Sequence, residues 1–388
     1  MEQKPTNHPV FKRSLAFLSM LTILMACGNR DTPSESNQSP GKSPALQLSD
    51  KEATEMASAL FANLGKLARD HVLVGHQDAL AYGMGWKGDA FRTDIHDAYG
   101  DHPAIFGWDL GHMGDPENID GVPFDRMVTW AIAAYEKGGI NTYSWHMRNY
   151  AIGGSSWDTD PCVEACLPGG EINALYLEKL DQAAVFFSSL KTSEGELIPV
   201  IFRPFHEMTG GWFWWGTRSC TPEQYKEIFR YTVDYLRNEK GLHQLIIAYS
   251  TDVFSSAEQY MTFYPGDEYV DVMAFDDYHG LNNRESARET IRRLEILDSL
   301  STAHHKLMAI SETGLETIPD EKWFTGVIIS TLDHNASTRR ASWILFWRNG
   351  RPDHFYAPYP GHSSVPDFSE FMNDSLILSL SELPPMYR

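Results

Sequence analysis

Eight short apolar runs alternate with amphipathic stretches along the chain, and this alternation constrains the fold more than any other feature of the sequence. The runs are short and apolar throughout, as expected for buried strands of a parallel sheet. They cover Val72–Gln77, Ala104–Leu110, Ile140–Met147, Ile198–Phe205, Leu245–Ser250, Val270–Asp276, Leu307–Ser311 and Ser342–Trp347. The amphipathic stretches between them include Phe124–Lys137, Asn173–Leu190, Pro222–Asn238 and Arg284–Ser299.

Apolar strands that alternate with helices indicate an α/β fold in which both faces of a parallel sheet are covered. Eight such units in roughly 340 residues favour a single (β/α)8 TIM barrel with long loops after the strands. A doubly wound open sheet is the alternative, but no glycine-rich G-x-G-x-x-G motif follows the first strand. Because no boundary of a second domain is visible, we expect residues 48–388 to form one catalytic domain.

The first 47 residues have the composition of an export signal and a tether. Lys12 and Arg13 precede a twelve-residue apolar run, which is too short to span a bilayer and ends directly before Cys27. This pattern resembles a bacterial lipobox, so we predict a lipoprotein signal peptide over residues 1–26 and lipidation of Cys27. An ordinary cleaved signal with a chance cysteine is the alternative. Residues 28–47 are rich in Ser, Pro, Gly and Asn, which predicts a flexible linker.

The charge of the chain narrows the class of partner. The sequence has 32 basic and 52 acidic residues, a net charge of −20. Residues 1–26 carry three of the basic groups and one acidic group, so the exported part has a net charge of −22. Such a chain repels phosphate backbones and anionic lipids, which excludes nucleic acid as a partner and leaves membrane contact only through a lipid on Cys27. The sequence carries no signal for an oligomer, and we expect a monomer.

Polar or aromatic residues stand at the C-terminal end of nearly every predicted strand. In a barrel these positions meet at one end, where catalytic residues of this architecture collect. Because a buried polar group costs free energy unless it is paired, packing does not explain so many of them. They are His76-Gln77, Asp109, His146, His206-Glu207, Ser250 to Asp252, Asp276-Asp277-Tyr278, Glu312 and Trp347-Arg348.

Two of these residues, Glu207 and Glu312, are the candidates for catalysis. Two carboxyl groups that face one another are what cleavage of a glycosidic bond requires, one protonated and one ionised. We expect Tyr278 or Arg203 to form a hydrogen bond with one carboxylate and to keep its pKa low. The alternative for each glutamate is an internal salt bridge with Arg203 or Arg348.

Tryptophan is the second signal, with 11 in the chain. Indole faces suit the apolar C–H faces of sugar rings, and Trp157, Trp347 and the run from Trp212 to Trp215 stand near the strand ends. Some of them must be core residues. We expect alternate members of the run to point inward, and Trp108 and Trp145, inside predicted strands, to be buried.

Other chemistries have weaker support. The histidines near the strand ends do not form an H-E-x-x-H motif, and no cysteine or carboxylate cluster completes a ligand set, so no metal site is predicted. No G-x-S-x-G motif of a serine hydrolase is present. After Cys27, three cysteines remain, and we expect any disulfide to join Cys162 and Cys166.

The chain resembles glycoside hydrolase family 26, the β-mannanases, within the clan of retaining (β/α)8 glycosidases. The most specific segments are Arg203–Met208 with the following Gly211–Gly216, and Ile310–Gly314. The resemblance covers nearly the whole body, from Val74 to Asn349. It implies that Glu207 is the general acid/base and Glu312 the nucleophile, that Tyr278 forms a hydrogen bond with the nucleophile, and that His206 supports the site.

The resemblance also implies sugar contacts. His146 would contact the sugar in the catalytic subsite, Trp347 would form the floor under it, and Arg348 would reach the next sugar outward. Trp212 and Trp157 would line the leaving-group side.

The reaction implied by the resemblance is hydrolysis of β-1,4-mannosidic bonds in mannan, glucomannan or galactomannan, with retention of configuration and without a cofactor. Exo-acting release of mannobiose and action on mixed-linkage β-glucan or β-1,3-xylan remain open. A non-catalytic carbohydrate-binding lipoprotein is a further alternative, although a binding relic would be expected to lack Glu207 or Glu312. The signal resembles those of Bacteroidetes lipoproteins. Since no acidic run follows Cys27, we expect the periplasmic face of the outer membrane rather than the cell surface.

Overall fold

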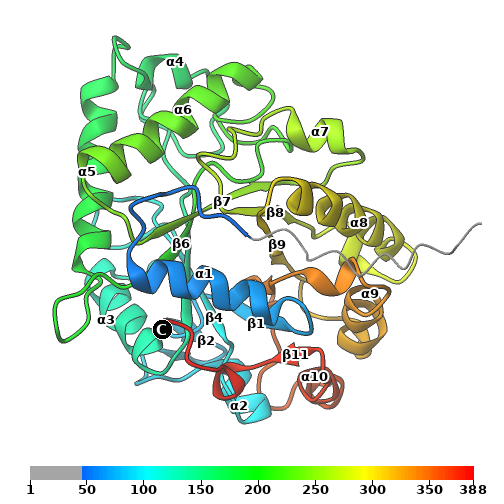
Figure 1. Cartoon of the computed structure of the whole chain (residues 1–388). Helices are drawn as coiled ribbons and strands as arrows, with labels where there is room; N and C mark the ends of the chain where they lie inside the picture. Colours follow the sequence, from blue (N-terminus) through cyan, green and yellow to red (C-terminus); the bar gives the residue numbers. More distant parts are fainter. Residues whose placement is uncertain (1–45) are drawn as a thin grey trace, which may run out of the picture. The chain divides into compact units, whose positions relative to one another are not determined.

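The computed structural model describes residues 46–388, in which eight parallel strands form a closed barrel (Figure 1). Each strand pairs with the next along the chain, and β10 pairs with β1 to close the barrel. The barrel strands are β1 (Val72–Gln77), β4 (Ile105–Asp109), β5 (Ile140–Ser144), β6 (Val200–Arg203), β7 (Leu245–Thr251), β8 (Val272–Asp276), β9 (Leu307–Thr313) and β10 (Trp343–Phe346). A short β11 (Ile377–Leu378) adds to β1, and β2 (Tyr82–Gly83) and β3 (Trp86–Lys87) form a small hairpin. The predicted TIM barrel and its eight strands are confirmed.

Helices cover the outside of the barrel. They are α1 (Glu55–Leu67), α2 (Asp94–Tyr99), α3 (Phe124–Glu136), α4 (Val163–Cys166), α5 (Asn173–Ser189), α6 (Pro222–Asp234), α7 (Ala257–Met261), α8 (Ala287–Ala303), α9 (Ser330–Leu332) and α10 (Val365–Met372). Helix α6 begins at a capping box formed by Thr221 and Gln224, with proline at the first turn. The stretch predicted as one helix over Pro222–Asn238 divides into α6 and a π-helical turn, η1 (Tyr235–Glu239).

The apolar core has two layers, and residues of β1 show how they are separated. Val72 and Val74 belong to the large cluster shared with the outer helices, whereas Leu73 belongs to a smaller one. Because successive side chains of a strand point to opposite faces, this smaller cluster fills the barrel interior. Helix α1 contributes Ala57, Leu60, Phe61 and Leu64 to it, all from one face of the helix. Helix α1 therefore packs against the apolar filling of the barrel and crosses the centre of the view in Figure 1.

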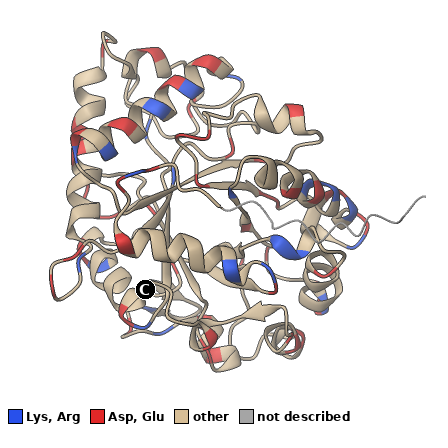
Figure 2. Ribbon diagram, in the orientation of Figure 1, with Lys and Arg blue, Asp and Glu red and all other residues tan. Residues whose placement is uncertain are grey.

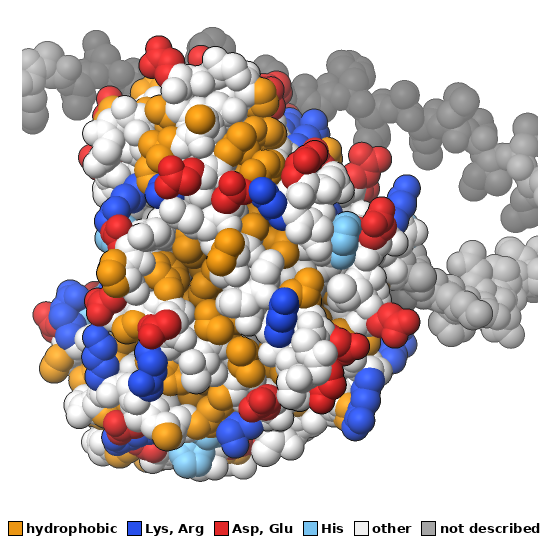
Figure 3. All heavy atoms as spheres, turned by 90° about the vertical axis from the view of Figure 1, so that its left-hand side faces the viewer, with side chains coloured by type: hydrophobic (Ala, Val, Ile, Leu, Met, Phe, Trp, Pro, Cys, Tyr) orange, Lys and Arg blue, Asp and Glu red, His pale blue; other side chains and the backbone are white. Residues whose placement is uncertain are grey.

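Acidic and basic residues are interspersed along the outer helices (Figure 2). On the side that carries α3 and α5, hydrophobic side chains lie exposed among them (Figure 3). Helix α5 contains Val185, whose side chain is largely exposed. Over residues 46–388 no helix combines the length and apolarity needed to cross a bilayer. The predicted signal peptide and Cys27, and all but the last two residues of the predicted linker, fall in residues 1–45, outside the described residues, and stay predictions.

Candidate active site

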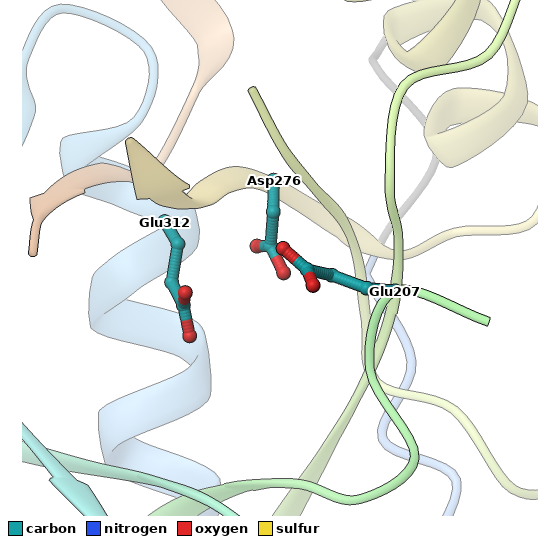
Figure 4. A group of neighbouring side chains, drawn as sticks. All are labelled: Glu207, Asp276 and Glu312. Atoms are coloured by element: carbon teal, nitrogen blue, oxygen red, sulfur yellow. The ribbon is translucent and has the colours of Figure 1, made fainter. Parts of the chain in front are cut away.

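Polar side chains from β4, β6, β8 and β9 meet at the C-terminal ends of the barrel strands. The three carboxylates of Glu207, Asp276 and Glu312 lie so close that one oxygen of each is within 4.8 Å of the others (Figure 4). Asp276 ends β8 and Glu312 lies near the end of β9, while Glu207 follows β6. The structure therefore brings together the two glutamates that the sequence singled out, and adds Asp276 between them.

The turn after β6 aims Glu207 at this cluster. Phe205 and Glu207 have φ values of 53° and 54°, a left-handed backbone conformation that residues other than glycine adopt rarely. Contacts with other elements hold the turn in place. The amide of Glu207 donates to the carbonyl of Ser250 at 3.0 Å, and the carbonyls of Phe205 and His206 accept from Tyr225 and Trp215. The predicted strand Ile198–Phe205 ends earlier, at Arg203, because the chain turns here.

A change of register between β8 and β9 positions Glu312. Phe275 pairs with Ile310, but Asp276 pairs with Glu312, so Ser311 is an extra residue in β9. The Oγ of Ser311 donates to Asp276 at 2.7 Å, and the carboxylate of Glu312 bonds to Arg203. Two successive residues of β9 thus turn their side chains to the same cluster, which a regular strand does not allow.

Arg203 supplies the positive charge of the cluster. Its Nη1 donates to Asp276 at 2.8 Å, and its Nη2 donates to Glu312. Tyr278 donates its hydroxyl to the other oxygen of Glu312 at 3.1 Å. Glu207 has a different partner, the indole N–H of Trp212 at 2.9 Å. Glu312 therefore has two donors, one of them a cation, whereas Glu207 has one neutral donor.

The pKa values of the two glutamates follow from these surroundings. Burial raises the pKa of Glu207 well above its ordinary value, and the charges of Asp276 and Glu312 raise it further. Burial also raises the pKa of Glu312, to about 7, although Arg203 opposes the rise. Arg203 and Tyr278 both bond to Glu312 as expected, but the expectation of a low pKa is wrong, because burial outweighs the charge of Arg203. The charge of Glu312 raises the pKa of Glu207, whereas the charge of Arg203 lowers the pKa of Glu312, and this difference favours an ionised Glu312 beside a protonated Glu207.

The run from Trp212 to Trp215 does not alternate between buried and exposed residues as was expected. Trp212 is half-buried, but Phe213, Trp214 and Trp215 are all buried, because this segment is an irregular loop and not a strand. The indole N–H groups of Trp214 and Trp215 donate to the carbonyls of Met147 and His206. Trp108 and Trp145 are buried, as predicted.

His146 lies near two of the three tryptophans predicted to bind sugar, Trp157 and Trp347. Its ring is stacked on Trp157 with centroids 5.3 Å apart, and its centroid is 6.3 Å from that of Trp347. Trp157 is 51% exposed, an unusual value for an indole, and Trp347 is half-buried. His206 is fully buried, with its Nε2 3.3 Å from Nε2 of His146. These rings form a partly exposed aromatic surface next to the glutamates.

Arg348 follows β10 and is held by partners from the segments after β1 and β4. It forms an ion pair of 2.8 Å with Asp120, and it donates to the hydroxyl of Tyr82 at 3.4 Å. That hydroxyl donates in turn to Asp78 at 2.6 Å. Arg348 therefore does not pair with Glu207 or Glu312, and of the predicted internal salt bridges only that between Arg203 and Glu312 is present among the described residues.

The three clustered carboxylates are close enough to share a cation, but Arg203 already bonds to two of them. Cys162 and Cys166 are buried neighbours with their Sγ atoms 3.6 Å apart, and both are free thiols in this structure.

The partners of the candidate residues were not predicted from the sequence. Asp276 and Asp109 were recognised only as polar strand ends, although Asp276 holds Arg203 and Asp109 holds His146. Their positions at the last residues of β8 and β4 were the available signal.

Comparisons with known proteins agree with this geometry. The sequence model of glycosyl hydrolase family 26 matches residues 49–316. A mannan endo-1,4-β-mannosidase of Bifidobacterium adolescentis is 30% identical over 367 residues, 87% of this chain and 36% of that protein. The chain thus spans about a third of that relative. A mannan endo-1,4-β-mannosidase of Bacillus subtilis is 28% identical over 79% of this chain and 82% of its own length.

The solved structures that resemble this chain also include β-mannanases. The structure of a family 26 β-mannanase from Bacteroides ovatus is 40% identical, with a TM-score of 0.83 over 86% of this chain and 98% of that one. An endo-β-1,4-mannanase from Cellulomonas fimi is 29% identical, with a TM-score of 0.83 over 88% of this chain and 79% of that one.

Proposed function

This chain belongs to glycosyl hydrolase family 26, and on that premise we propose that it is a retaining β-mannanase. The substrate is a polysaccharide with β-1,4-mannosidic bonds, namely mannan, glucomannan or galactomannan, and the bonds are cut within the chain. Relatives described as mannan endo-1,4-β-mannosidases support this substrate.

The observation that carries the proposal is the spacing and inequality of the two glutamates. One oxygen of Glu207 lies within 4.8 Å of one oxygen of Glu312. Retaining glycosidases hold their carboxyl groups about 5–5.5 Å apart, and inverting enzymes about 6.5–9.5 Å apart to admit a water. The short separation supports retention, and the different partners of the two glutamates support different roles.

The first step uses the two glutamates together. The carboxylate of Glu312 attacks the anomeric carbon while Glu207 transfers its proton to the leaving glycosidic oxygen, so that the C–O bond breaks and a glycosyl ester forms on Glu312. Arg203 and Tyr278 hold Glu312 in position for the attack. In the second step Glu207, now ionised, takes a proton from water, which hydrolyses the ester and restores both groups.

Substrate binding is assigned to the surrounding rings and to Arg348. We assign His146 and Trp347 to the sugar in the catalytic subsite, and Arg348 to the next sugar outward. Trp212 and Trp157 line the leaving-group side, and the bond from Trp212 to Glu207 ties that side to the acid. His206 supports His146 from a fully buried position.

The rate of hydrolysis is expected to depend on pH in a bell shape. Activity requires Glu312 to be ionised, so kcat/KM rises with pH through the pKa of Glu312, near 7. Activity also requires Glu207 to be protonated, so kcat/KM falls again as the pH rises through the pKa of Glu207, which burial and the charges of Asp276 and Glu312 raise well above its ordinary value. Measuring kcat/KM on mannohexaose from pH 4 to 10 tests this pH dependence. An acid limb near pH 4.5, the range of an unperturbed glutamate, would contradict it.

Product analysis tests the substrate and the mode of cutting. The protein is incubated with mannan, mixed-linkage β-glucan and β-1,3-xylan, and then with mannohexaose in a time course followed by chromatography. We expect sugars to be released from mannan, with a spread of product sizes at the earliest times. Mannobiose alone from the start would instead support the exo-acting alternative. Release from β-glucan or xylan without release from mannan would overturn the proposed substrate.

A further inference from the structure

A row of hydrogen-bonding groups connects β4 to the candidate active site through His146. Oδ2 of Asp109 lies 2.7 Å from Nδ1 of His146, and Nε2 of His146 lies 3.3 Å from Nε2 of His206. Asp109 accepts four hydrogen bonds in all, since the Oγ of Ser144 at 2.7 Å and the amides of Gly111 at 2.6 Å and His146 at 3.2 Å also donate to it. We propose that Asp109 is a positioning residue, which keeps a proton on Nδ1 of His146 and holds this imidazole charged and oriented beside Glu312. The proposal rests on the proposed function and names a residue that acts through His146.

The proton positions follow from the chemistry of the three groups. An ionised Asp109 only accepts, so Nδ1 of His146 must be the donor. The contact between the two Nε2 atoms requires one proton between them. When His146 is charged, its Nε2–H donates to His206, which then carries its own proton on Nδ1. When His146 is neutral, His206 must donate instead. One proton on His146 therefore sets the tautomer of His206 as well.

The surroundings favour the charged form of His146. Burial alone would lower its pKa, but the charge and hydrogen bond of Asp109, followed by the charges of Glu312 and Asp120, raise it. Asp109 stays ionised, because His146, Ser144 and the Gly111 amide offset its burial and hold its pKa at about 2. His206 stays neutral, since burial and the neighbouring charges of Arg203 and His146 lower its pKa.

A charged His146 leaves a buried polar atom of His206 without a hydrogen bond. Nδ1 of His206 is buried and has no hydrogen-bond partner among the described residues. With His146 charged this atom carries an unpaired N–H, and with His146 neutral it carries only an unpaired lone pair. His206 therefore opposes the charge on His146, and the anionic Asp109 is what maintains it.

The charge on His146 affects the ionisation of Glu312. The charge of His146 lowers the pKa of Glu312, in the same direction as Arg203. A charged His146 thus favours the ionised form that the proposed nucleophile needs. Loss of that charge is expected to move the acid limb of the pH profile to higher pH.

The test is Asp109→Asn, which keeps the shape of the side chain. Oδ1 of Asp109 accepts from two backbone amides, those of Gly111 and His146. The carbonyl of asparagine will keep these bonds, which turns its amide toward Nδ1 of His146. That ring nitrogen must then accept, so the proton moves to Nε2 and His146 becomes neutral, a change of tautomer of the kind that disables a catalytic histidine.

We expect kcat/KM on mannohexaose to fall about 10- to 100-fold and the acid limb to move upward by about one pH unit. In ¹⁵N NMR spectra at pH 7, both ring nitrogens of His146 will be protonated in the wild-type protein and only Nε2 in the variant. Ser144→Ala is the matched control. It removes one hydrogen bond from the same carboxylate but leaves its charge, so the acid limb and the tautomer will stay as in the wild type.

Two results would overturn the proposal. One is a neutral His146 in the wild-type spectrum at pH 7, which is decisive even if Asp109→Asn does not fold. The other is a variant that loses activity with an unchanged acid limb and tautomer, which would make Asp109 a merely structural residue. A wild-type protein that leaves mannan and mannohexaose intact would refute the proposed function, and the spectra would still decide the state of His146.

Discussion

Glu312→Ala is expected to reduce kcat/KM on mannohexaose by about 10⁴-fold or more, the scale seen when a nucleophile is removed. The reason is that no other carboxylate has the same partners. Asp276 is close, but its oxygens already accept from Arg203, Ser250 and Ser311. The barrel should stay folded, because Arg203 keeps Asp276 as an ion-pair partner when Glu312 is lost.

Two measurements separate this outcome from a general loss of structure. The melting temperature of the variant should remain within several degrees of the wild type, since one buried ion pair persists. Azide, a small external nucleophile, should restore part of the turnover of an activated aryl β-mannoside by entering the space of the lost carboxylate. Glu316→Ala is the matched control, because Glu316 is an exposed glutamate four residues further on that bonds to His354. Near wild-type activity in Glu312→Ala would sink the nucleophile assignment.

The barrel was predictable because its signal is local. Buried parallel strands must be apolar on both faces, so the eight runs are visible in the sequence itself. The strand β1 has the predicted bounds, Val72–Gln77. The boundaries that differ depend on tertiary contacts. The strand β6 ends at Arg203 because the following residues enter a left-handed turn held by Ser250, Tyr225 and Trp215.

The site was predictable in its residues but not in its electrostatics. Glu207 and Glu312 each stand just beyond the end of an apolar run, which marks them for the barrel mouth. The extra residue at Ser311 and the place of Asp276 are set by pairing between β8 and β9, which has no local signature. The raised pKa of Glu312 has the same origin, since it reflects how completely the folded protein removes water from the carboxylate.

Glu207→Ala is expected to reduce kcat/KM by about 10²- to 10⁴-fold on mannohexaose, because the sugar leaving group needs a proton. On an aryl β-mannobioside with a good leaving group, the loss should be much smaller, since such a phenolate departs without help. The second step still lacks its base, so the glycosyl ester on Glu312 should accumulate and produce a burst of the phenol.

Glu207→Ala also tests whether the acid and the nucleophile are correctly distinguished. Its control is Trp212→Phe, which removes the only hydrogen bond that the side chain of Glu207 receives among the described residues but leaves the carboxyl in place. We expect the control to lose little activity on either substrate. Mass spectrometry of the stalled Glu207→Ala protein should locate the sugar on Glu312. Equal losses on good and poor leaving groups would contradict acid assistance by Glu207, because only a group that donates the proton is sensitive to the basicity of the leaving oxygen.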